Sequence, residues 1–146
     1  MAKLRAYFDT SVIVKRYVAE PGSPGARALM QRYRVVSSAL TPIEILSALT
    51  RRHAAGDLSD RDFAAILVGM DRDRHLWELV EVTALVLGRA EDLVRAGTLR
   101  TLDAIHVASA LVFESEARIR LPFITGDDRQ HAGARQAGLK VLGVAG

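Results

Sequence analysis

Leu4-Arg5-Ala6-Tyr7-Phe8-Asp9-Thr10-Ser11 contains an apolar run that ends at an acid followed by two hydroxyl residues. The run predicts a short buried strand over residues 4–8, and the pattern after it predicts a helix over 11–18. A strand that passes directly into a helix is the first half of a βα unit. The opening of the chain therefore indicates an α/β fold.

The rest of the chain alternates in the same way. Further strands are expected at residues 35–37, 77–82, 121–125 and 139–144. Further helices are expected at residues 26–33, 41–56, 59–70, 84–96, 102–116 and 128–137. Strands alternating with helices predict a parallel sheet. No linker interrupts the pattern, since the Pro/Gly stretch 21–25 is too short to separate domains, so residues 1–146 are expected to form a single domain.

Composition narrows the class of protein. A hydrophobic fraction of 49% supports a packed core, and the absence of cysteine excludes disulfides and thiolate metal sites. The net charge of +3 permits a polyanionic partner without identifying one. Asp9 interrupts the only stretch that resembles an export signal, and no apolar run approaches the roughly 20 residues of a membrane span. A cytoplasmic protein without a membrane segment is expected.

Four acids occupy similar positions in the predicted elements. Asp9 and Asp127 each follow a strand, whereas Glu44 and Asp103 each lie in the first turn of a helix. Such positions gather at the carboxyl edge of a parallel sheet, where ligands bind in open α/β folds. One pair of like charges ~4 Å apart costs about 4 kcal/mol at an effective dielectric constant near 20. The four acids therefore require a hard cation such as Mg²⁺ or Mn²⁺, or must remain partly protonated.

Each acid also has a purely structural explanation. Asp9 could cap the helix that follows it, and the negative charge of Asp103 suits the first turn of its helix. Thr41-x-x-Glu44 and Asp127-x-x-Gln130 both match capping boxes. Asp128 could be the last cap instead of Asp127. The neighbouring hydroxyls Ser11, Thr10 and Thr125 could orient a carboxylate or cap a helix.

The order and spacing of these residues resemble the PIN-domain nucleases, and among them the VapC-type toxins. The matching strings are Asp9-Thr10-Ser11, Glu44 after Pro42, Asp103-Ala104-Ile105-His106 and Thr125-Gly126-Asp127. The resemblance implies a PIN-like three-layer α/β/α domain with a central parallel sheet of about five strands. It places Asp9, Glu44, Asp103 and Asp127 on the family's acidic, metal-binding quartet, with Ser11 and Thr125 as supporting hydroxyls.

The resemblance implies hydrolysis of RNA phosphodiester bonds with Mg²⁺ or Mn²⁺, leaving 5′-phosphate and 3′-hydroxyl ends. It also implies the role of toxin in a type II pair, with a VapB-type protein antitoxin and a homodimer. The apolar surface for these contacts could come from Val12/Tyr17, Leu46/Leu49 and the 63–70 face, although core packing also explains them.

Individual roles for the remaining polar residues are less specific. His106 is expected to be a hydrogen-bonded packing residue, and Trp77 a core residue. The candidate phosphate contacts are Lys15-Arg16, Arg51-Arg52-His53, Arg72, Arg74 and His75, for which a solvated helix face is the alternative.

The sequence alone leaves other functions open. A PIN nuclease acting in RNA processing would carry the same residues, and so would an inactive PIN fold used as a binding scaffold. A receiver-type signalling domain is disfavoured because no lysine lies between Lys15 and Lys140. A phosphatase of the Asp-x-Asp-x-Thr type is disfavoured because Ser11 stands where the second acid is required.

Overall fold

The computed structural model describes residues 3–97 and 99–144. Its strands are β1 (Arg5–Phe8), β2 (Arg34–Ser38), β3 (Glu78–Val80), β4 (Phe123–Thr125) and β5 (Val141–Gly143). Its helices are α1 (Thr10–Tyr17), α2 (Ser23–Arg32), α3 (Thr41–Ala54), α4 (Asp60–Arg74), α5 (Ala84–Ala96), α6 (Thr101–Ala117) and α7 (Asp128–Gln136). Each expected element is present, which confirms the predicted α/β alternation.

The five strands form one parallel sheet in the order β3-β2-β1-β4-β5. The strand β1 is central, with β2 on one side and β4 on the other. The chain thus places β2 and β3 on one side of β1 and then adds β4 and β5 on the other side. This change of direction beside β1 creates a crevice at the carboxyl ends of the strands, where α/β proteins bind their ligands.

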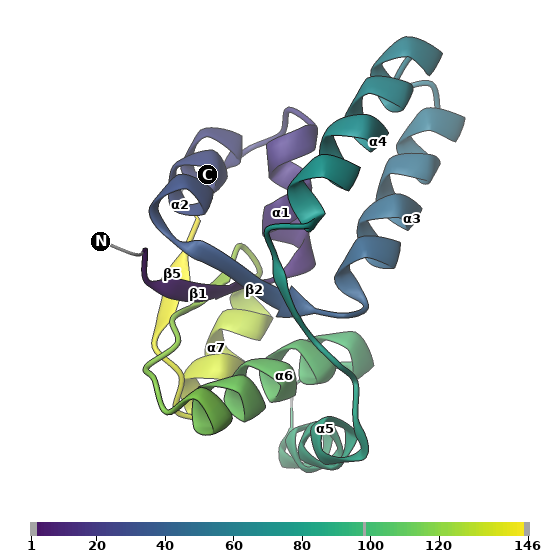
Figure 1. Ribbon diagram of the computed structural model, residues 1–146. Coiled ribbons are helices and arrows are strands. Elements are labelled where there is room, and N and C mark those ends of the chain that lie inside the picture. The colour runs from purple at the N-terminus through teal and green to yellow at the C-terminus, as the bar shows by residue number, and fades with distance from the viewer. Residues whose placement is uncertain (1–2, 98, 145–146) are drawn as a thin grey trace.

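Helices cover both faces of the sheet (Figure 1). The helices α1 to α4 pack with Ala6, Phe8 and Ile124, whereas α5, α6 and α7 pack with Tyr7 and Phe123. Successive residues of β1 therefore face opposite cores, as the period of a strand requires. The three-layer α/β/α arrangement expected from the sequence is confirmed.

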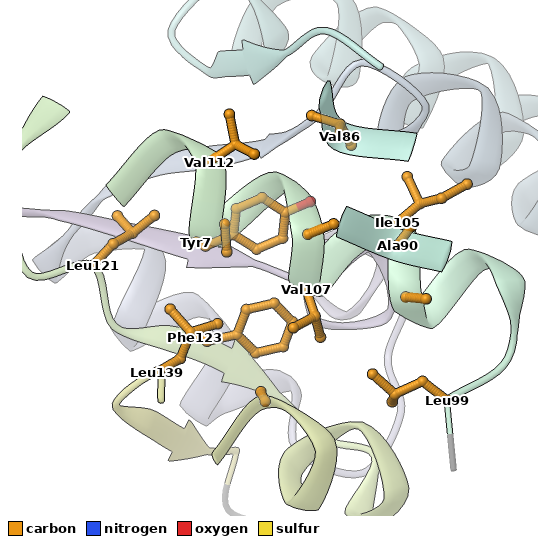
Figure 2. Close-up of a cluster of buried hydrophobic side chains, with 14 of the residues drawn as sticks. Tyr7, Val86, Ala90, Leu99, Ile105, Val107, Val112, Leu121, Phe123 and Leu139 are labelled. Carbon is orange, nitrogen blue, oxygen red and sulfur yellow. The ribbon is translucent and has the colours of Figure 1, made fainter. Parts of the chain in front are cut away.

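The core under α6 is built around two aromatic rings. Tyr7 and Phe123 lie on the adjacent strands β1 and β4 and stack with ring centroids 5.2 Å apart and planes 5° apart. Figure 2 shows the two rings one above the other, with the Tyr7 hydroxyl pointing toward the side of the cluster that holds Ile105. The Tyr7 hydroxyl is a polar atom within this core, and it needs a partner because it is buried.

One expectation about the helices needs correction. The Pro/Gly stretch 21–25 was expected to interrupt the chain up to Ala26, but α2 begins at Ser23. Pro24 is tolerated there because the first turn of a helix needs no amide donor. Among the apolar surface candidates, Val12 and Leu49 are fully buried, while Leu46 is 43% exposed. Trp77 is a core residue, as expected.

No helix in the described part of the chain is both long enough and apolar enough to span a bilayer.

A partly buried polar cluster joins α1 to α4. Asp73 accepts hydrogen bonds from the Tyr17 hydroxyl at 2.8 Å and from Arg16 Nε at 3.1 Å. Burial alone would raise the pKa of Asp73, but these two donors and the charge of Arg16 lower it below its ordinary value. The ionised carboxylate therefore stabilises the fold, and Arg16 is committed to this structural contact.

We predict that Asp73→Asn destabilises the protein by about 1–2 kcal/mol at pH 7, because a charged hydrogen-bond acceptor is lost. A lowered pKa stabilises the folded state above the ordinary value near 4, and this contribution is lost as the pH falls through the lower folded pKa. Denaturant unfolding should show a difference in the free energy of unfolding between wild type and variant, and this difference should vanish below about pH 4. Asp71→Asn, on the exposed side of the same helix, is the matched control. Equal stability of Asp73→Asn and wild type at pH 7 would contradict this account.

Candidate active site

Asp9 lies at the end of the central strand, where β1 passes into α1. Its side chain is nearly buried and forms no cap for α1, so the capping explanation of this residue is wrong. Instead its Oδ2 accepts a hydrogen bond of 2.5 Å from the Ser11 hydroxyl. Burial raises the pKa of the Asp9 carboxyl, although the charge of His106 and the bond from Ser11 oppose the shift. The side chain is thus a buried acid whose oxygens face the crevice rather than the helix end.

Glu44 reaches the same crevice from α3. Its expected capping box with Thr41 is absent, since no side chain caps the start of α3. Glu44 Oε1 instead accepts hydrogen bonds from the Thr10 hydroxyl at 3.0 Å and from His106 Nε2 at 2.8 Å. The first bond comes from α1 and the second from α6. Three helices therefore meet at this one carboxylate.

His106 is the buried residue that connects the core to the acids. The side chain is hydrogen-bonded as expected, but its role in holding Glu44 could not be predicted from the sequence. Its Nδ1 lies 2.7 Å from the Tyr7 hydroxyl, and its Nε2 lies 4.0 Å from Asp9 Oδ1. Burial alone would lower the pKa of His106, but the bond to Glu44 and the charge of Asp9 raise it. Burial and the nearby acids raise the pKa of Tyr7 as well, so that its phenol stays neutral.

Asp103 lies in the first turn of α6, as expected, and is half-buried. Burial raises the pKa of its carboxyl, and the charges of Asp9 and Asp127 raise it further. Asp9, Asp103 and Asp127 line the same cavity, which accounts for this repulsion.

Asp127 contributes to the crevice and also caps a helix. Its Oδ1 accepts a hydrogen bond of 2.8 Å from the Gln130 amide, so Asp127 rather than Asp128 is the cap of α7. Its own amide donates to the Thr125 hydroxyl at 3.1 Å. The side chain of Asp128 is exposed and does not line the cavity. Of the two adjacent acids, the geometry favours Asp127 as the site residue.

The four acids line a single cavity of about 640 Å³, together with Ser11, while Thr125 lies just behind Asp9. The other charged lining residues are Glu20, Arg51, Arg52 and Asp57. The cavity is therefore acidic at the edge of the sheet and of mixed charge along α3. The four segments that the sequence analysis singled out do converge.

The carboxylates of the described residues do not form a closed cage. No three acidic or histidine side chains there are close enough to enclose a cation. Hydrogen bonds hold Asp9 to Ser11, Glu44 to His106 and Asp127 to Gln130, so three of the four carboxylates are held by partners within the chain. Carboxylates that repel one another remain separated unless a cation or proton lies between them. The oxygen-only donor set nevertheless suits a hard divalent cation.

The basic candidates separate into two groups. Arg51 and Arg52 line the cavity, and Arg52 forms an ion pair of 2.5 Å with Glu20. Outside the cavity, His53 is bonded to Asp60 and stacks on Phe63, and Arg16 and Arg72 are paired with Asp73. Lys15 is paired with Glu20 at 3.1 Å. Arg51 is therefore the guanidinium best placed to meet a substrate.

We predict that Asp103→Asn raises the melting temperature of the metal-free protein at pH 7 by about 2–4 °C, because repulsion among the acids is relieved. An acid with a raised pKa destabilises the folded state once the pH exceeds its ordinary value near 4, and this effect is absent below that value. Thermal unfolding in EDTA should show the higher melting temperature of the variant at pH 7, and this difference from wild type should disappear toward pH 4. Asp128→Asn should leave the melting temperature unchanged. A metal-free Asp103→Asn protein that melts below wild type at pH 7 would refute the repulsion argument.

Comparison with known proteins supports the resemblance to PIN-domain nucleases. The family model described as PIN domain matches residues 6–136. The chain is 36% identical over 140 residues to Ribonuclease VapC49 of Mycobacterium tuberculosis, with 92% of each protein covered. It is also 36% identical over 137 residues to Ribonuclease VapC46 of the same species, covering 93% of this chain and 95% of the relative.

Solved structures show the same fold at low identity. One is VapBC2 from Rickettsia felis bound to a DNA fragment from their promoter, with a TM-score of 0.64, 12% identity and coverage of 96% of this chain and 98% of that chain. Another is a toxin–antitoxin complex from Klebsiella pneumoniae, with a TM-score of 0.63, 18% identity and coverage of 88% and 91%. The family match and the curated relatives span nearly the whole chain. The protein belongs to the PIN-domain family and, within it, to the VapC ribonucleases.

Proposed function

We propose that this protein is a metal-dependent endoribonuclease that hydrolyses RNA phosphodiester bonds as the toxin of a type II toxin–antitoxin pair. The observation that carries the proposal is the convergence of Asp9, Glu44, Asp103 and Asp127 on one cavity in a chain of the VapC ribonuclease family. The alternative of an inactive scaffold gives no reason for four acids to be kept at one site against their repulsion. Residues 1–146 would act as a single domain, in the cytoplasm where the RNA substrate occurs.

Divalent-metal dependence is general among PIN-domain ribonucleases. In this chain the quartet would hold Mg²⁺ or Mn²⁺, since carboxylate oxygens are the ligands that these ions prefer. A bound cation supplies a nucleophilic water at neutral pH and offsets negative charge on the phosphate. Ser11 holds Asp9, and His106 with Thr10 holds Glu44, so that both carboxylates are oriented before substrate arrives. One acid of the quartet accepts the proton that the attacking water loses.

The proposed partners follow from the surface around the cavity. On α3, Ile43 is 66% exposed and Leu46 is 43% exposed, and Leu102 at the cavity edge is 50% exposed. These apolar side chains suit a VapB-type antitoxin segment that covers the cavity, with a basic side chain directed at the acids. A homodimer would bury further exposed apolar residues. The solved structures of similar fold that are toxin–antitoxin complexes favour the toxin role over a role in RNA processing.

We predict that the purified protein cleaves labelled single-stranded RNA with Mn²⁺ or Mg²⁺ but not in EDTA, and that Asp9→Asn lowers the rate by at least about 100-fold. Sequencing of the ends should show 5′-phosphate and 3′-hydroxyl groups at defined sites. Asp128→Asn, which alters an exposed acid beside the cavity, should retain most of the activity.

The same variants test the toxin role in cells. Expression of the wild-type chain should arrest growth, and expression of Asp9→Asn should not. Equal arrest by both proteins would contradict the nuclease mechanism. Cleavage in the test tube without growth arrest would favour the RNA-processing role.

Arg51 provides a prediction about RNA binding. It lies two turns beyond Glu44 on α3, about 10 Å along the helix axis. It donates to Ser47 at 2.8 Å, and no acid in the described ranges forms an ion pair with it. We predict that Arg51→Ala raises KM several-fold with little change in kcat, and lowers the slope of log affinity against log salt by about 0.7. Arg89→Ala, on an exposed face of α5, is the control. An unchanged salt slope would exclude a phosphate contact by Arg51.

A further inference from the structure

Gln130 is a fully buried amide in the first turn of α7. The capping box expected with Asp127 is only half formed. The backbone amide of Gln130 donates to Asp127 Oδ1, but the Asp127 amide donates to the Thr125 hydroxyl rather than to the Gln130 side chain. Helix capping therefore explains the backbone of Gln130 and leaves its buried side chain unexplained.

The side chain of Gln130 contacts the hydroxyl that adjoins Asp9. Its Oε1 lies 2.8 Å from Thr125 Oγ1, and the same hydroxyl lies 3.4 Å from Asp9 Oδ2. The Thr125 hydroxyl has one proton, so it cannot donate to both oxygens. The Gln130 Nε2 has no hydrogen-bond partner among the residues that the structure describes. A buried donor without a partner costs about 1–3 kcal/mol.

A rotation of the Gln130 amide by 180° exchanges its nitrogen and oxygen and removes this conflict. The Nε2 then donates to Thr125 Oγ1, which also accepts from the Asp127 amide through its second lone pair. The single proton of Thr125 is left to donate to the Asp9 carboxylate. Hydrogen bonds to ionised acceptors are roughly twice as strong as neutral ones. The remaining unpaired atom is a carbonyl oxygen, which is tolerated more often than an unpaired amide nitrogen.

We propose that Gln130 is a positioning residue for Asp9, acting through Thr125. Its amide donates to the Thr125 hydroxyl and thereby directs the hydroxyl proton to Asp9 Oδ2, the oxygen that also accepts from Ser11. Two hydroxyl donors then fix one oxygen of a carboxylate that would otherwise rotate. This inference rests on the proposed function to the extent that Asp9 binds a cation.

The position of α7 supports a fixed geometry. Gly133 lies one turn after Gln130, and a Cβ at that residue would approach Leu99 Cδ2 to 2.7 Å. Because Gly133 has no side chain, α7 packs closely against Leu99 in the loop before α6. The helix that carries Gln130 is therefore closely packed one turn after this residue.

The test measures binding of Mn²⁺ alone to the metal-free protein, by electron paramagnetic resonance of the free ion. Mutating a residue that hydrogen-bonds a metal ligand lowers metal affinity by roughly 10–100-fold. Gln130 is one hydrogen bond further from the metal, because it contacts Thr125 rather than Asp9 itself. Gln130→Met should therefore weaken Mn²⁺ binding by about three- to ten-fold, and Thr125→Val by about ten-fold. The double variant should bind no more weakly than Thr125→Val, because both changes interrupt the same relay.

Gln136→Met makes the same substitution on the exposed face of α7 and should leave Mn²⁺ affinity unchanged. Unchanged Mn²⁺ affinity in Gln130→Met, or losses that multiply in the double variant, would overturn the proposal. If Gln130→Met does not fold, nuclear magnetic resonance of the wild-type Gln130 side-chain amide gives the answer. Thr125→Val should then shift one of its two amide protons, and no shift would overturn the relay.

The two proposals can fail separately. RNA cleavage with normal Mn²⁺ binding in Gln130→Met would leave the nuclease assignment intact and exclude the relay. If the two single variants and the double variant lose Mn²⁺ affinity as expected but the wild-type protein cuts no RNA, the relay would be supported and the nuclease assignment excluded.

Discussion

Repulsion among carboxylates at the carboxyl edge of the sheet is the constraint on which the rest of the structure depends. Asp9 is buried at the end of the central strand, and Asp103 and Asp127 line the same cavity. A fold that places acids in this way needs donors to hold each carboxylate apart from the others. Ser11, His106 and the first turn of α7 supply those donors. The resulting cavity is open and anionic before any ligand enters it.

His106 makes the site continuous with the hydrophobic core. Tyr7 stacks on Phe123 inside the core, and its hydroxyl meets His106 Nδ1 at 2.7 Å. The other ring nitrogen of His106 bonds Glu44. The orientation of a surface carboxylate is thereby set by ring packing on β1 and β4. Residues that pack the core under α6 consequently help to set the geometry of the cavity.

The fold was predictable because each element carries a local signal. The periodic apolar runs predicted the α/β alternation, and the acids that follow strands or lie in first helical turns predicted the shared edge of Asp9, Glu44, Asp103 and Asp127. The partners of those acids were not predictable in the same way. Contacts such as His106 to Glu44 or Thr125 to Gln130 depend on how separate elements pack, and no periodic pattern encodes them. For Glu44 the local reading was misleading, since the capping-box pattern is present in the sequence and the box is not formed.

The cavity combines both signs of charge in a fixed order along α3. Glu44 faces the other acids, and Arg51 lies two turns further along the same cavity. A phosphate cannot bind beside four carboxylates unless cations compensate them, but its neighbour in an RNA chain can bind a guanidinium directly. The arrangement therefore favours a chain of phosphates over a single one, since only a polymer reaches both ends of the cavity. A polypeptide that carries a basic side chain into the acidic end satisfies the same charges without being cut, which is how one site can serve both substrate and inhibitor.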